Sequence, residues 1–216
     1  MLSIFQTGQP YLTLPLAAGF MLLAPLVAVG LYETSRRLEM GENVTIWHSL
    51  NGFRRNPGQI GAIGVVLMLF FLAWTRIAML LFALFYNGTM PSLDVLIWET
   101  FFSRDAMTFL ITGSILGGAL AFIVFAISVV SIPLLVDRDV DVISAVIISV
   151  NAFRKNWKVL VGWAAVIAIL AACGMVVLMF GLAVIMPLLG YSSWHAYRGI
   201  VDTSQSDVPR LRRQVP

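Results

Sequence analysis

The residue with the clearest chemical potential is Arg76, in the apolar stretch FLAWTRIAML. A lone guanidinium in such a setting can bind an anion or hydrogen-bond to a neighbouring helix. We place Arg76 about ten residues, roughly 15 Å, from the predicted outer end of its helix, near the middle of a bilayer. A cation there costs at least about 2.5–3.5 kcal/mol on insertion scales, so it requires relief. Three polar residues of the last apolar stretch are expected at comparable depth: Tyr191, Ser192 and Ser193.

An acidic cluster, DRDVD, follows the third apolar stretch and contains Asp137, Asp139 and Asp141. Carboxylates at this density could hold a hard cation such as Ca²⁺. An acidic residue at such a position more often caps the start of the next helix and pairs with a nearby arginine, here Arg138. We expect the capping role.

The two histidines, His48 and His195, have no spacing that requires a shared haem or metal site. We expect His195 to belong, with Trp194 and Tyr197, to an aromatic belt at the membrane interface. The sequence contains no Walker loop, G-x-S-x-G, H-E-x-x-H or cysteine pair. We therefore predict no enzymatic activity, no catalytic residue, no metal site and no cofactor. An enzyme acting on lipid headgroups is the weaker alternative.

The composition of the chain indicates the environment in which these residues lie. The chain of 216 residues is 59% hydrophobic and only 12% charged, against roughly 25% charged residues in globular proteins. Uncharged stretches of about 20 residues are long enough for membrane-spanning helices. The final stretch is nearly twice that length and contains glycines and a proline, so it is divided into two helices. Five spans are predicted: about 12–32, 60–86, 107–135, 158–178 and 181–198.

The distribution of cations gives the orientation. Arginine and lysine are concentrated in 33–59, in 137–158 and after 198, whereas the 87–106 connection is acidic. The positive-inside rule then places the N-terminus outside and the C-terminus in the cytoplasm. We expect a basic cytoplasmic tail, residues 201–216, without regular structure. Because topology accounts for the cations, no separate basic domain is left for nucleic acid.

The chain contains a short internal repeat, SLNGFRRN at 49–56 and SVNAFRKN at 149–156, with an offset of 100 residues. Each copy follows one predicted span and precedes the next. In each copy the apolar residues recur with helical spacing and the polar residues fill the opposite side. Both copies are therefore predicted to be amphipathic helices at the cytoplasmic interface. Two spans separate the copies, which makes the duplication parallel. Four cations are expected to face lipid phosphates: Arg54, Arg55, Arg154 and Lys155.

Four stretches resemble a family of bacterial integral membrane proteins, the domain-of-unknown-function family 2189. They are LAAGFMLLAPLVAVGLYETSRRLEMGE, RRNPGQ, SIPLLVDRDVDVISAV and MPLLGYSSWHAYR, and the resemblance covers nearly all of 12–200. It implies a Gram-negative inner-membrane protein of about six helices, with no established activity and no site residues to carry over. Family members usually carry a further hydrophobic segment upstream of the point where this chain begins.

We thus expect an all-α, polytopic transmembrane helical bundle with two interfacial helices, within one integral membrane domain, residues 1–200. The predicted function is non-enzymatic: interaction with, or assembly of, other components of the bacterial inner membrane. The expected partners are membrane lipids and another membrane protein or a second copy of the chain. The alternative is a small-solute transporter or permeation protein that uses Arg76.

Overall fold

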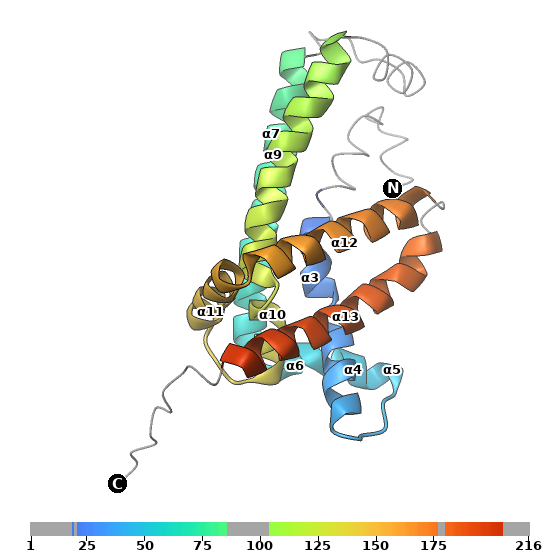
Figure 1. Cartoon of the computed structure of the whole chain (residues 1–216), viewed down its shortest axis with the longest axis vertical. Coiled ribbons are helices and arrows are strands. Elements are labelled where there is room, and N and C mark those ends of the chain that lie inside the picture. The colour runs from blue at the N-terminus through green and yellow to red at the C-terminus, as the bar shows by residue number, and fades with distance from the viewer. Residues whose placement is uncertain (1–18, 20, 86–103, 177–179, 205–216) are drawn as a thin grey trace. The chain divides into compact units, whose positions relative to one another are not determined.

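The fold is known from a computed structural model, which describes residues 19, 21–85, 104–176 and 180–204. Every regular element of these residues is a helix, which confirms the all-α prediction. The chain divides into two compact units (Figure 1). The first comprises residues 1–26 and 61–125, and the second comprises 27–60 and 126–216. The elements are η2 (Met21–Leu23), α3 (Ala24–Val27), α4 (Val29–Glu39), α5 (Ile46–Leu50), α6 (Gly52–Arg55), α7 (Pro57–Phe85), α9 (Arg104–Ser128), α10 (Ser131–Asp137), α11 (Val142–Lys155), α12 (Trp157–Val176) and α13 (Phe180–Ser204).

Three segments of the described residues are long and apolar enough to cross a membrane: Pro57–Phe85, Met107–Asp137 and Trp157–Gly174. They coincide with the second, third and fourth predicted spans. Many of their large apolar side chains are exposed, as expected of surfaces that lipid covers. The predicted first span, 12–32, and the acidic connection, 87–106, lie largely outside the described residues. The fifth span stays a prediction.

In the first unit, α7 and α9 lie side by side (Figure 1). The stretch GSILGG of α9, residues 113–118, is rich in small residues and permits close packing at Gly117. A β-carbon there would stand 2.8 Å from the Trp74 indole. Near the start of α9, Phe109 makes edge-on ring contacts with Phe82 and Phe85, with centroids 6.3 and 5.8 Å apart. A glycine near the middle of α9 and an aromatic cluster near its start thus join an antiparallel pair.

The core of the second unit surrounds α10, which contacts α4, α6, α11 and α13. Every residue from Ser131 to Val136 is buried. The third predicted span was expected to be one helix, but α9 ends at Ser128 and α10 begins at Ser131. Pro133 explains the break, because its ring has no N–H to offer the carbonyl of Val129 and would clash with it.

The two copies of the repeat form different helices. The second copy lies in the continuous helix α11, whereas the first is interrupted at Asn51 between α5 and α6. The copies differ at the next position, Gly52 against Ala152, and glycine is about 1 kcal/mol poorer than alanine in a helix. Glycine is needed here, since a β-carbon on Gly52 would stand 2.8 Å from the Val29 carbonyl oxygen.

The last two helices, α12 and α13, confirm that the long apolar stretch is divided in two. They approach closely where each carries a glycine, since a β-carbon on Gly181 would stand 2.8 Å from the Cα of Gly174. The helix α13 continues to Ser204 and buries Val201. The prediction of an unstructured tail from residue 201 is therefore wrong for its first four residues. Residues 205–216 lie outside the described part.

Candidate functional site

The repeated segments are fastened to the preceding helices by serines at equivalent positions, Ser49 and Ser149. The hydroxyl of Ser49 is 2.8 Å from the Thr34 hydroxyl of α4. The hydroxyl of Ser149 donates to the Ala126 carbonyl at 2.8 Å and accepts from the Val130 N–H at 3.2 Å. Ser49 and Ser149 thus hold the inner faces of these helices against the preceding ones, and on α11 this buried face also includes Ala145 and Phe153.

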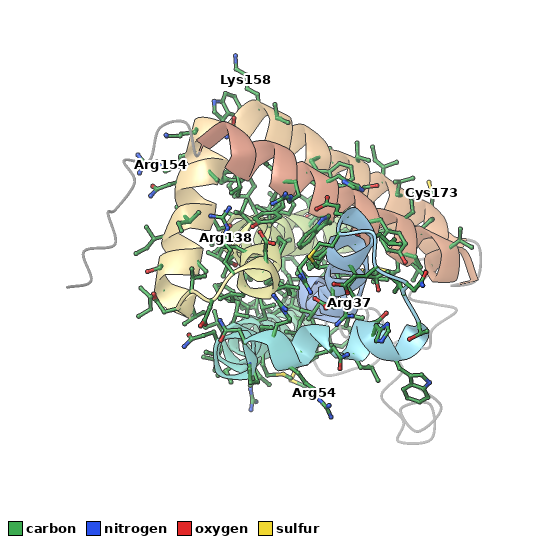
Figure 2. All side chains as sticks on the ribbon, turned by 90° about the horizontal axis from the view of Figure 1, so that it is seen from below. Arg37, Arg54, Arg138, Arg154, Lys158 and Cys173 are labelled. Atoms are coloured by element: carbon green, nitrogen blue, oxygen red, sulfur yellow. The ribbon has the colours of Figure 1, made fainter. Side chains whose placement is uncertain are left out.

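The opposite faces of these helices point outward and are apolar. Large side chains such as Trp47, Leu50, Ile143 and Ile147 are exposed, with relative exposures of 77, 57, 68 and 55%. The four predicted lipid-facing cations are also exposed: Arg54, Arg55, Arg154 and Lys155. Figure 2 shows Arg54, Arg154 and Lys158 extending away from the helices. Exposed apolar residues beside exposed cations suit a helix lying in a membrane interface.

The end of the first copy is also linked, within the second unit, to the segment 136–142 that precedes the second copy. The guanidinium of Arg55 donates to the Val136 carbonyl at 3.4 Å, and the Asn56 amide donates to the Val140 carbonyl at 2.9 Å. Gln59 accepts a hydrogen bond from the Val142 N–H at 2.9 Å. The end of the first copy and the residues that follow it therefore satisfy backbone groups between the end of α10 and the start of α11. Arg55 consequently has a packing role in addition to its exposed position.

A buried carboxylate, Glu33, lies on α4 and is fully enclosed. It accepts hydrogen bonds from Arg36 at 2.8 and 2.9 Å and from Arg37 at 2.7 Å. Burial by itself raises the pKa of the Glu33 carboxyl, but the hydrogen bonds and charges of the two arginines outweigh burial and hold this pKa below its usual value. Charge-assisted bonds of this kind offset the desolvation of the carboxylate.

A second cluster joins α13 to the ends of α10 and α4. The Tyr197 hydroxyl donates to Asp137 at 2.8 Å. The guanidinium of Arg198 lies 3.7 Å from Asp137 and 3.3 Å from Glu39. Glu39 is also 3.6 Å from Nδ1 of His195. One cationic residue thus bridges the acidic residues that end two different helices, which fixes α13 against both.

The acidic cluster DRDVD behaves as predicted. Asp141 caps α11 by accepting a hydrogen bond from the Ser144 N–H at 2.8 Å. Asp137 pairs with Arg138 at 3.6 Å. The hydrogen bonds from Ser144 lower the pKa of the Asp141 carboxyl. Asp139 is exposed.

The predicted aromatic belt is wrong. Trp194 and Tyr197 are buried inside the second unit, with relative exposures of 0 and 1%. Trp194 packs between Tyr197 and Tyr32, with ring centroids 5.4 and 6.4 Å apart. These rings meet because α13 packs on α4, a contact that hydropathy along one helix does not reveal. His195, on another face of α13, is exposed.

The candidate residues of the apolar stretches fall in different units. Arg76 lies on α7 in the first unit and is exposed, and no hydrogen bond or ion pair within the described ranges engages it. Tyr191, Ser192 and Ser193 lie on α13 in the second unit. There Ser192 and Ser193 are both half-buried.

Tyr191 lines an open hollow of about 330 Å³ in the second unit, which we call the α4–α13 hollow. Its lining residues are Ser35, Leu38, Glu39, Tyr191 and His195. The Ser35 hydroxyl is buried and has no hydrogen-bond partner within the described residues. The hollow therefore combines an acidic group, an imidazole, an aromatic ring and an unsatisfied hydroxyl.

Comparison with known proteins assigns the chain to a family. Residues 13–137, more than half of the chain, match a family model described as a predicted integral membrane protein, DUF2189. The chain belongs to this family. Neither a curated protein nor a solved structure matches it. Membership confirms the resemblance seen in the sequence over the matched residues, and the family description states a membrane location without an activity.

Two residues with notable contacts, Glu33 and Glu39, were not identified as candidates from the sequence. Both lie in YETSRRLE, and Glu33 precedes Arg36 and Arg37 by three and four residues, the spacing of helical ion pairs. That spacing could have indicated the pairing. It could not have indicated that Glu33 is fully buried, since burial comes from the packing of other helices on α4.

Proposed function

We propose that this family member is a non-enzymatic interaction component of the bacterial inner membrane, which binds a transmembrane helix of another protein. The observation that carries the proposal is Arg76, an exposed cation on the apolar helix α7. A guanidinium surrounded by lipid chains is unfavourable by at least about 2.5–3.5 kcal/mol. A partner that supplies an acidic side chain at the same depth would remove this cost.

Charge complementarity favours a different protein over a second copy. No Asp or Glu occurs in three stretches of this chain, which are 34, 31 and 39 residues long: 60–93, 106–136 and 159–197. A second copy therefore offers Arg76 no carboxylate from these stretches. We infer that the partner helix carries Asp or Glu near the middle of its span.

The second unit supports this role because it holds two amphipathic segments in place that suit the membrane surface. Its two repeated segments are held by Ser49 and Ser149, and their apolar and cationic faces point outward. In the orientation that the cations favour, both segments lie on the cytoplasmic side, with the N-terminus outside. Reporter tags in the 87–106 connection and after residue 200 test this. Tags on the same side of the membrane would contradict it.

The partner is tested by affinity purification from native membranes in mild detergent, with four variants. Wild type and Arg76→Lys should recover a stoichiometric protein that has an acidic residue within a span, and Arg76→Leu should lose it. Ala73→Leu, a change at a neighbouring exposed residue, is the matched control and should retain it. Replacing the partner's acidic residue by lysine should be rescued by Arg76→Glu. Recovery of the chain alone, or only of further copies of it, would refute the proposal.

The transporter alternative rests on the same residue and on the parallel duplication. It predicts that Arg76→Leu abolishes uptake of an anionic solute into proteoliposomes that contain this protein alone. The interaction proposal predicts that such proteoliposomes show no Arg76-dependent uptake.

A further inference from the structure

The α4–α13 hollow has the features of a small ligand site that the interaction role does not use. Its volume of about 330 Å³ lies at the small end of the ~300–1,000 Å³ typical of ligand pockets. Ser35 is only 3% exposed, and its hydroxyl has no partner in the described residues. A buried polar group without a partner is costly, so a ligand atom that accepts or donates a hydrogen bond there is favoured.

The charges beside the hollow have both signs. Glu39 is held by His195 Nδ1 at 3.6 Å and by Arg198 Nε at 3.3 Å, and its side chain retains 31% exposure. The carboxylate can therefore accept further hydrogen bonds from a ligand. The His195 ring is 69% exposed and directs one nitrogen to Glu39, which leaves its other nitrogen able to donate to an anion.

This arrangement discriminates between classes of ligand. A simple anion would meet the Glu39 carboxylate, and a simple cation would meet Arg198. A zwitterion places its ammonium beside Glu39 and its anionic group beside His195, so that both charges are satisfied. The ring of Tyr191 adds a face on which an ammonium group is favoured.

We propose that the α4–α13 hollow binds a phosphate ester that carries a primary ammonium group, the chemistry of the phosphoethanolamine headgroup. The ammonium donates to Glu39, the phosphate accepts from His195, and an ester oxygen accepts from Ser35. The hollow lies at the end of α4 that carries Arg36 and Arg37, where the predicted orientation places phospholipid headgroups. Exposed Leu38 gives it an apolar edge for the start of an acyl chain.

The test uses the full chain, purified and delipidated in a neutral detergent, with binding followed by native mass spectrometry. The probes are phosphatidylethanolamine, phosphatidylcholine, phosphatidylglycerol and soluble O-phosphoethanolamine. Phosphatidylethanolamine should bind at least about tenfold more tightly than phosphatidylglycerol, the difference expected for one charge-assisted hydrogen bond. Phosphatidylcholine, which lacks ammonium N–H donors, should bind more weakly than phosphatidylethanolamine. Competition by O-phosphoethanolamine at equal concentration would assign a soluble source, and its failure to compete would assign a membrane lipid.

Glu39→Gln should weaken phosphatidylethanolamine binding at least about tenfold and leave phosphatidylglycerol binding unchanged or stronger. Glu42→Gln is the matched control, since Glu42 is an exposed glutamate outside the hollow that pairs with Arg37, and it should bind as wild type does. His195→Gln, at an exposed position, provides a second variant with little risk to folding and should also weaken binding. Equal affinity of wild type for phosphatidylethanolamine and phosphatidylglycerol, or equal behaviour of the Glu39 and Glu42 variants, would overturn the proposal.

Discussion

The hydroxyl of Ser149 offers the sharpest test of how the repeated segments are held. Ser149 is 0% exposed. Its hydroxyl accepts from the Val130 N–H at the break between α9 and α10, and donates to the Ala126 carbonyl. In Ser149→Ala both backbone groups lose this partner. Within the described residues, no other acceptor serves the Val130 N–H.

The expected cost follows from these two bonds. Leaving a buried donor unsatisfied costs about 1–3 kcal/mol, and alanine returns about 0.5 kcal/mol of helix propensity relative to serine. The net loss of unfolding free energy for Ser149→Ala should thus be about 0.5–2.5 kcal/mol. Ser49→Ala should cost less, because its partner Thr34 keeps a hydrogen bond to the Gly30 carbonyl at 3.0 Å.

The assay is unfolding of the detergent-solubilised protein by sodium dodecyl sulfate, followed by tryptophan fluorescence. Asn151→Ala is the matched control, since Asn151 is exposed on the same helix, α11, and gains a similar helix propensity. It should leave stability unchanged or slightly raised. If Ser149→Ala and Asn151→Ala unfold at the same detergent concentration, the hydroxyl bridge does not stabilise the fold and the reasoning fails.

Two further predictions concern α4. Gly52→Ala should destabilise the protein by up to about 2 kcal/mol, because the new methyl group meets the backbone at Val29, and overpacking of about 1–3 kcal/mol exceeds the gain in helix propensity of about 1 kcal/mol. Gly58→Ala, where a β-carbon meets nothing within 4 Å, should be neutral or stabilising in the same unfolding assay, and equal effects would contradict the close approach. Because the pKa of Glu33 is lowered by folding, its stabilising contribution is complete above the unfolded value of about 4.3 and is lost as the pH falls through the folded value. Unfolding measured from neutral to acidic pH should therefore show a loss of stability below about pH 4 that Glu33→Gln reduces, and an identical pH dependence in both proteins would rule out this pairing.

The amino-acid sequence alone was sufficient to predict the membrane class, the all-α fold, three of the spans and the repeat. These features depend on hydropathy and periodicity along a single segment, which the local sequence contains in full. The cap at Asp141 was predictable for the same reason, since a capping residue and the N–H groups it binds are three positions apart. The close packing at Gly117 likewise uses a local feature, the small residues of GSILGG on one helix.

Which residues are buried became clear from the packing of the helices. Nothing in the local pattern distinguishes Glu33, which is fully buried, from an ordinary exposed glutamate. Trp194 and Tyr197 were expected at the interface but lie in the core, because α13 packs on α4 across more than 150 residues of sequence. The α4–α13 hollow arises in the same way. Burial depends on which surfaces other helices cover. The hydrophobic periodicity of one segment does not reveal its contacts with a distant segment.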